Sequence, residues 1–246
     1  MKRFLTIVII PILLSCNQAG KSEINEQKLT SEDSLIISII LPNSLNDRRM
    51  EFETYVNSAI NNIKLFAHKY NWDKYTEKTF MDSIMIFDNK RDFDKKLLIL
   101  VGMDTTMKLP ETFTGALEKR TLLVVTPEIY SKVYPEGIEE NSYEKLLTHE
   151  IAHRLHIRIL NGDEEAMGPI WFYEGFAIFT ANQFSKSSIH LNKNEIIEVM
   201  NNPERGSYLK YGYVFRYFVN KVSLQELIKK AKNEGFNEWL QSELHN

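Results

Sequence analysis

The sequence predicts an α+β fold with a β-containing amino-terminal half and a helical carboxy-terminal half. Between residues 34 and 135, short apolar runs bounded by turn-forming residues accompany one long amphipathic segment, which is typical of mixed strands and helices. From residue 136 onward, apolar residues recur at helical spacing. One cysteine in 246 residues allows no disulfide framework, so the chain must be stabilised by a hydrophobic core, which it is long enough to form.

The first 33 residues have the composition of an export signal followed by a tether. Residues 1–15 combine a basic start with an apolar run that is too short for a membrane span of about 20 residues. The run ends in Leu-Leu-Ser-Cys, which is similar to a bacterial lipobox. We expect Cys16 to be lipidated and to anchor an exported protein to a membrane of the bacterial cell envelope; the alternative is an ordinary cleavage site. The polar residues 16–33 are expected to form a flexible tether.

Residues 34–135 are expected to form a mixed α/β subdomain that contains an edge strand. The predicted strands are Ser34–Leu41, Ile84–Phe87, Leu97–Val101 and Thr121–Val125, and the predicted helix is Asp47–Tyr70. Gly115–Glu118 is interpreted as a turn that leads into an edge strand.

Residues 136–246 are expected to form a helical subdomain. Asn141 and Glu144 match a capping box at the start of its first helix, which is expected to end near Leu160, before a glycine. Pro169 fits a first-turn position of the next helix. The remaining predicted helices are Asn192–Asn201, Ser207–Phe218, Ser223–Lys232 and Asn237–Leu244.

The first helix of this half carries the stretch Thr-His-Glu-Ile-Ala-His over residues 148–153. Residues four apart differ by about 40° in azimuth on an α-helix, so His149 and His153 project from one face. Both imidazoles can therefore reach one Zn²⁺ ion at about 2.0–2.1 Å. Glu150 points toward the same side and can hold a water molecule rather than the metal.

A third metal ligand is predicted at Glu174. This residue is the single charge in the eleven residues 171–181, which are otherwise dominated by aromatic and aliphatic side chains. Burying an ionised carboxylate in such surroundings is costly unless the carboxylate is paired or bound to a metal. The alternative is an exposed face of the helix, but the apolar neighbours at helical spacing argue against a solvated stripe.

Together, the two histidines and the stretch Trp-Phe-Tyr-Glu-Gly-Phe-Ala over residues 171–177 resemble the gluzincin metallopeptidases, in particular aminopeptidase N-like enzymes and small bacterial relatives. The resemblance covers about residues 141–220. It implies a zincin-like fold with the active site between the two halves, one Zn²⁺ ion held by His149, His153 and Glu174, and Glu150 as general base. Twenty residues separate His153 from Glu174, two more than in the aminopeptidase N-like enzymes.

Two further residues are assigned roles by the same resemblance. Gly115–Glu118 is similar to the motif whose glutamate grips a substrate amino group, so Glu118 is a candidate substrate-binding residue. The favoured alternative is that this stretch leads into an edge strand that pairs with the substrate backbone. Tyr208 matches the tyrosine that donates a hydrogen bond to the oxyanion, with Tyr211 as its rival and simple packing as the alternative for both.

The sequence offers several candidates for the residues that orient the histidines. Thermolysin-like gluzincins carry an aspartate four residues after the ligand glutamate, where this chain has Ile178. Glu144, Thr180 and Asn182 are candidates for the supporting role. His156 lies about 10 Å along the helix from His149, too far to share its ion, so packing or a supporting hydrogen bond is expected.

These features predict a zinc-dependent metallopeptidase that hydrolyses peptide bonds with Glu150 as general base and Tyr208 as oxyanion donor. Cleavage within a chain and cleavage at its amino terminus are alternatives. The competing hypothesis is a non-catalytic surface lipoprotein that uses a peptidase-like fold as a binding module. A formal net charge of −3 without a basic cluster argues against a nucleic-acid partner, so the expected partners are a peptide or protein substrate and a membrane.

Overall fold

The computed structural model describes residues 37–244, except for the side chain of Glu136. The predicted signal, Cys16, the tether and the start of the strand expected from Ser34 lie outside the described residues. The described residues belong to one compact unit. None of their helices is long and apolar enough to cross a membrane.

The α+β class is confirmed, because every strand among the described residues lies in the amino-terminal half, and helices make up the carboxy-terminal half. The first half contains β1 (Ser38–Ile40), α1 (Arg49–Lys69), β2 (Ser83–Phe87), α2 (Lys90–Val101), β3 (Gly115–Glu118), β4 (Thr121–Val125) and α3 (Pro127–Val133). The second half contains α4 (Ser142–Ile159), α5 (Ile170–Thr180), α6 (Lys193–Asn201), α7 (Tyr208–Val219), α8 (Leu224–Lys230) and α9 (Phe236–Glu243).

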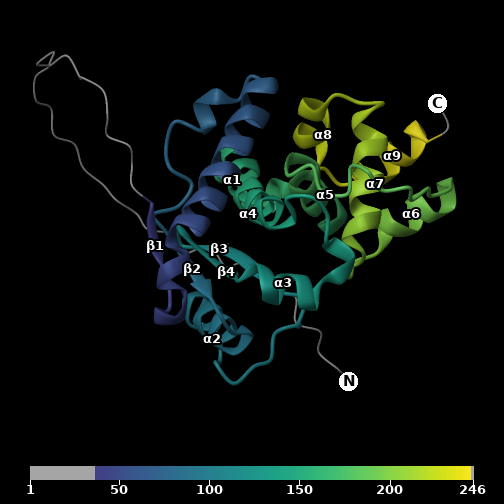
Figure 1. Cartoon of the computed structure of the whole chain (residues 1–246). Helices are drawn as coiled ribbons and strands as arrows, with labels where there is room; N and C mark the ends of the chain where they lie inside the picture. Colours follow the sequence, from purple (N-terminus) through teal and green to yellow (C-terminus); the bar gives the residue numbers. More distant parts are fainter. Residues whose placement is uncertain (1–36, 245–246) are drawn as a thin grey trace, which may run out of the picture. The chain divides into compact units, whose positions relative to one another are not determined.

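The four strands form one mixed sheet in the order β1-β2-β4-β3. The first three run parallel, and β3 is antiparallel to β4. Helix α2 packs on one side of the sheet, and α1 and α4 lie on the other (Figure 1). The side chains of Leu122–Val125 in β4 are fully buried, as expected of a strand covered on both faces.

Helix α4 is held in position by α1 and by the sheet. The buried face of α1, which includes Phe52, Val56 and Ile63, packs against α4. The buried hydroxyl of Tyr143, in the first turn of α4, donates a 2.8 Å hydrogen bond to the carbonyl of Val125 at the end of β4. Helix α4 is therefore held at its start by the sheet and along its length by α1.

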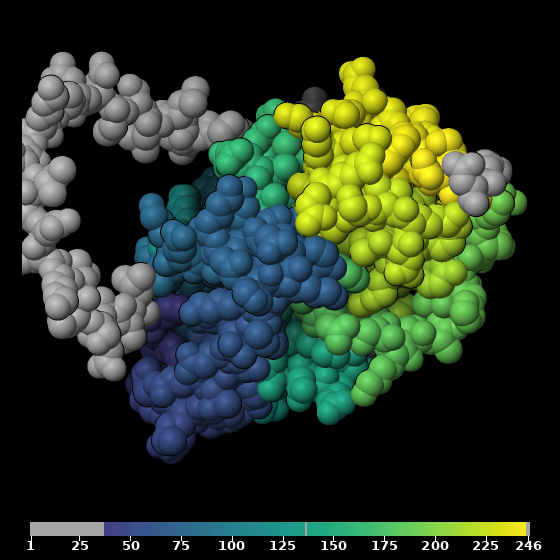
Figure 2. Space-filling view, turned by 90° about the horizontal axis from the view of Figure 1, so that it is seen from above, coloured from purple at the N-terminus to yellow at the C-terminus, as the bar shows by residue number. Residues whose placement is uncertain are grey.

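Helices α5 and α7 approach each other closely. A Cβ atom built on Gly175 of α5 would lie 2.8 Å from Cβ of Phe215 in α7, so the contact requires glycine at this position. The segment around α1 (blue) and the carboxy-terminal helices (yellow) are neighbours on the face seen in Figure 2.

The prediction of a strand over Leu97–Val101 is wrong, because these residues form the last turns of α2. The helix begins after Asn89, whose side chain accepts a 2.8 Å hydrogen bond from the amide of Asp92. Its buried residues Phe93 and Leu97 are four apart, which is helical spacing. A short apolar run cannot by itself distinguish a strand from the buried end of a helix.

The edge strand is also misplaced in the sequence-based prediction. Gly115–Glu118 is itself the edge strand β3, and Thr121–Val125 lies inside the sheet, between β2 and β3. The turn consists of Lys119 and Arg120. Both have positive φ angles, as two-residue hairpin turns require when the turn follows the twist of the two flanking strands. Helix α3, directly after β4, was not predicted because Pro127 reads as a stop although it is the first residue of the helix.

The predicted capping box at Asn141 is absent. Asn141 adopts a left-handed conformation with φ 57°, and its side chain makes no capping hydrogen bond. An N-cap residue normally has an extended backbone that aims its side chain at the first free amides, and a left-handed residue does not. The capping box that does form joins Asn192 and Glu195 at the start of α6.

His156 of α4 is fully buried, and neither of its ring nitrogens has a hydrogen-bond partner among the described residues. Its ring stacks on Phe176, with ring centroids 4.4 Å apart, so packing is its role. Burial, aided by the nearby His153, lowers the pKa of His156 from 6.5 to about 3. His156 is therefore neutral in the folded protein.

This burial predicts an acid-dependent loss of stability. The unfolded chain protonates His156 near pH 6.5, whereas the folded protein does so only near pH 3, so its contribution is present above pH 6.5 and is lost as the pH falls. Between pH 7 and 4.5 the loss amounts to about 2–3 kcal/mol. Denaturant unfolding in a chelator should show a shallower pH dependence for His156→Leu than for wild type. The exposed His190→Gln control should follow wild type, and parallel curves for His156→Leu would contradict the assignment.

Candidate metal centre

The three predicted metal ligands lie together. Nε2 of His149 is 3.2 Å from both Nε2 of His153 and Oε2 of Glu174, and Nε2 of His153 is 3.6 Å from the same oxygen. Ligand atoms about 2.05 Å from a tetrahedral ion would be separated by roughly 3.3 Å. The three separations therefore match the face of a tetrahedron centred on one zinc-sized ion.

The local structure explains this arrangement. His149 and His153 share one face of α4, and α5 packs against that helix and carries Glu174. Glu174 is only 2% exposed and His149 4%, whereas the side chain of His153 retains 22% exposure. The cluster is thus closed on the Glu174 side and more open on the His153 side.

Glu174 is ionised although it is buried. Burial alone would raise its pKa, but its contacts with His149 and His153 and the charges of His153 and Arg205 outweigh this effect and hold the pKa well below 4.5. A buried anion next to two imidazoles is a donor set that favours a divalent cation. The residues present therefore fit zinc.

The residue that orients His149 is Gln183, which the sequence analysis missed. Nδ1 of His149 lies 2.9 Å from the side-chain oxygen of Gln183, which is buried at 6% exposure. Because an amide oxygen only accepts, Nδ1 carries the proton and the Nε2 lone pair is left to face the cluster.

None of the expected candidates has this role: Asn182 is exposed, the Thr180 hydroxyl has no partner among the described residues, and Glu144 accepts a hydrogen bond from Thr148 through its backbone carbonyl.

Glu150 lies directly against the edge strand. A Cβ atom added to Gly115 of β3 would come within 2.8 Å of Oε1 of Glu150, so only glycine leaves the carboxylate in this place. Burial raises the pKa of Glu150 from 4.5 to about 7, and the nearby carboxylates of Glu174 and Glu118 add to the rise. A carboxylate with a pKa near 7 can both accept and return a proton at neutral pH.

The structure separates the two candidate tyrosines. The ring of Tyr208, the first residue of α7, lies 5.7 Å from the ring of His149, and its hydroxyl oxygen accepts a hydrogen bond from Arg205. The hydroxyl of Tyr211 instead bonds to the backbone amide of Gly206 and to the carbonyl of Glu204. Of these two candidates, Tyr208 is therefore the one beside a metal ligand; Tyr173, which the sequence analysis did not consider, has its ring 5.9 Å from the ring of His153.

Glu118 lies at the end of β3. Burial raises its pKa, and the charge of Arg154 on α4 opposes the rise. Arg154 also donates a 3.3 Å hydrogen bond to the carbonyl of Leu117, which links α4 to this strand. Glu118 is close enough to influence the pKa of Glu150, but it does not belong to the cluster of His149, His153 and Glu174 that could hold a metal ion.

Arg205, in the loop between α6 and α7, is a second residue that the sequence analysis missed. Its Nη1 atom is 2.8 Å from Oε1 of Glu174, although the arginine side chain is 44% exposed. A loop arginine in a polar stretch gives no local sequence signal of this contact.

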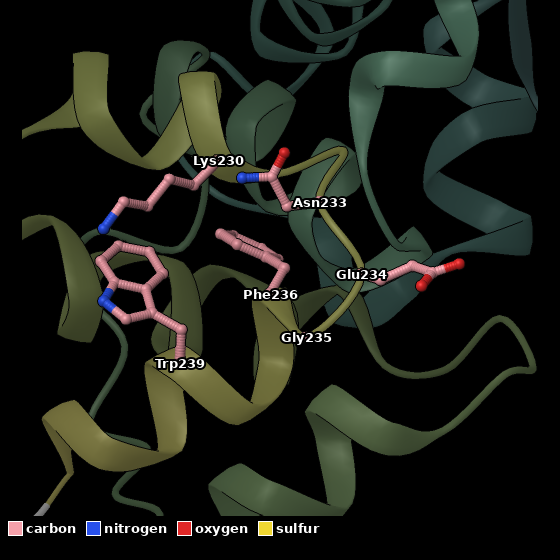
Figure 3. Close-up of a pocket in the computed structure, with 6 residues that line it drawn as sticks. All are labelled: Lys230, Asn233, Glu234, Gly235, Phe236 and Trp239. Atoms are coloured by element: carbon pink, nitrogen blue, oxygen red, sulfur yellow. The ribbon is translucent and has the colours of Figure 1, made fainter.

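A separate hollow of about 220 Å³ lies between α8 and α9 and contains none of the predicted site residues. Figure 3 shows its lining, with Phe236 and Trp239 rising from α9 beside Lys230. The Lys230 ammonium group lies 3.9 Å from the centre of the Trp239 ring, so these two lining residues form a cation–π contact with each other.

The Gln183 contact predicts a specific loss of metal affinity. Gln183→Leu removes the acceptor that fixes the His149 ring, and losses of this kind weaken metal binding about 10- to 100-fold. Competition between the protein and a chelator of known zinc affinity measures the change. The exposed Gln225→Leu on α8 is the matched control and should bind zinc as wild type does. Equal zinc affinity for Gln183→Leu and wild type would contradict the orienting role.

Comparison with known proteins adds no identification: no family model, no curated protein and no solved structure matches this chain. The interpretation of the centre therefore depends on its own residues and their geometry.

Proposed function

We propose that the protein is a zinc-dependent metallopeptidase of the gluzincin type with a zincin-like fold, in which His149, His153 and Glu174 hold one Zn²⁺ ion. The observation that carries this proposal is the tetrahedral spacing of three ligand atoms, with the half-buried carboxylate of Glu150 next to them and its pKa raised. The described residues offer no fourth His, Cys, Asp or Glu ligand in this cluster, and three protein ligands are the pattern of catalytic rather than structural zinc sites.

When bound, zinc would lower the pKa of a coordinated water molecule and polarise a peptide carbonyl. Glu150 would accept the proton of the attacking water and then pass it to the leaving amine. Burial, which raises the pKa of Glu150, favours its holding the proton between the two transfers.

The substrate backbone would pair with the outer edge of β3, next to Gly115. The amide of Val125 bonds to the carbonyl of Thr114 at 3.0 Å, and bonded positions alternate along an antiparallel pair. The backbone groups of Gly115 and Leu117 therefore face away from β4, and Arg154 engages the carbonyl of Leu117. A peptide added at this edge would lie beside Glu150, which supports the edge-strand alternative for Gly115–Glu118.

Tyr208 would donate its hydroxyl proton to the oxyanion of the tetrahedral intermediate. Its place beside His149 supports this role over a role for Tyr211. The signal and lipobox in residues 1–16 support an exported, lipid-anchored protein that acts on peptides or proteins of the bacterial cell envelope.

The first test replaces the proposed base. Glu150→Gln should retain zinc but lose about 10²- to 10⁴-fold of turnover, because the side chain keeps its shape and can no longer accept the proton. Cleavage of a diverse peptide mixture, read by mass spectrometry, measures the loss, and the cut positions distinguish internal from amino-terminal cleavage. Glu144→Gln, on the same helix, is the control and should cleave normally. Unimpaired cleavage by Glu150→Gln would reject the mechanism.

A second test uses the contact between β3 and Glu150. Gly115→Ala places a methyl group within 2.8 Å of the Glu150 carboxylate and should displace it. We expect kcat/KM to fall at least about tenfold, equivalent to about 1.4 kcal/mol, while zinc content stays unchanged. Normal activity in the zinc-loaded variant would show that the position of Glu150 against β3 is not needed for cleavage.

A further inference from the structure

Arg205 contacts two groups of the metal centre through one nitrogen atom. Its Nη1 atom lies 2.8 Å from Oε1 of Glu174 and also donates to the hydroxyl oxygen of Tyr208. A guanidinium nitrogen of this kind carries two hydrogens and can make both contacts at once. Arg205 therefore joins the ligand glutamate on α5 to the tyrosine on α7.

The contact with Glu174 assigns different tasks to the two carboxylate oxygens. Oε2 faces His149 and His153, and Oε1 is engaged by Arg205. Rotation of the carboxylate would break the ion pair with the arginine. Glu174 is therefore fixed so that it offers one oxygen to the ion.

The contact with Tyr208 determines where the phenol proton can go. A guanidinium group has donors but no acceptor, so the Tyr208 oxygen can only accept from Arg205. The single hydroxyl proton of Tyr208 must then point to another acceptor. The tyrosine ring lies 5.7 Å from the His149 ring, so a reacting group bound beside His149 would be within the reach of this proton.

The loop that carries Arg205 is tied down on both sides of this residue. The hydroxyl of Tyr211 accepts a hydrogen bond from the amide of Gly206 and donates one of 3.3 Å to the carbonyl of Glu204. Tyr211 itself is only 2% exposed and belongs to the core. Arg205 is thus mounted on an anchored backbone, although its side chain is partly exposed.

We propose that Arg205 is a positioning residue of this centre, which holds Glu174 as a one-oxygen metal ligand and directs the Tyr208 hydroxyl proton toward the reacting group. The second part rests on the proposed peptidase function, whereas the first concerns metal binding alone.

Zinc affinity, measured by chelator competition on the full-length protein, tests the first part. Arg205→Met should weaken zinc binding about tenfold, as expected when a partner of a metal ligand is lost, and Arg205→Lys should recover part of it. Arg120→Met is the matched control. The side chain of Arg120 has the same 44% exposure and is also paired with a carboxylate, but its partner is the exposed Asp82 and not a metal ligand. Unchanged or tighter zinc binding by Arg205→Met overturns the proposed hold on Glu174.

Peptide cleavage by the zinc-saturated variants tests the second part. Arg205→Met should lower kcat and leave KM nearly unchanged. In a Tyr208→Phe background, where no phenol proton remains, the same substitution should cost less than about twofold. Equal losses in both backgrounds overturn this part.

A wild-type protein that binds zinc tightly but cleaves no peptide refutes the proposed function and the Tyr208 part, while the affinity comparison still decides the Glu174 part. Wild-type protein without zinc affinity refutes both proposals.

Discussion

The burial of an ionised carboxylate is the constraint on which this centre depends. Glu174 is 2% exposed on a helix whose other buried residues are almost all apolar. A charge in such a place must be matched by partners, because its desolvation is otherwise costly by several kcal/mol. The partners are two histidines from α4 and Arg205 from the loop before α7. Three segments of the chain are thus held in place around one side chain.

The surrounding fold supplies these partners at fixed positions. Tyr143 ties the start of α4 to the end of β4, and Gly175 lets α7 approach α5 closely enough to bring Tyr208 beside His149. The edge strand completes the arrangement, because Gly115 leaves room for Glu150. Helix, sheet and loop therefore contribute different groups to one centre. The close contacts at Gly115 and Gly175 determine how near β3 lies to Glu150 and how near α7 lies to α5.

The sequence predicted the parts of this centre that local spacing controls. His149 and His153 share a helix face, and the isolated charge of Glu174 in an apolar helix indicated a buried, paired carboxylate. Gln183 and Arg205 could not be predicted, because they belong to segments outside α5 and α7 whose positions depend on tertiary packing. The same limit explains the errors in the fold. Leu97–Val101 is apolar enough for either a strand or a helix end, and the edge strand was assigned to the wrong side of the hairpin turn.

The order of these groups along the chain bears on how the centre assembles. Twenty residues separate His153 from Glu174, and Gln183 follows within the next ten. The free-energy cost of closing a loop rises by only about 0.6 kcal/mol for each doubling of its length, so the two residues by which this connection exceeds that of the aminopeptidase N-like enzymes add almost nothing to the cost. The parallel pairs β1-β2 and β2-β4, in contrast, join segments separated by long crossovers. The three metal ligands thus come from two neighbouring helices, whereas the position of Glu150 also requires β3, which the sheet holds in place.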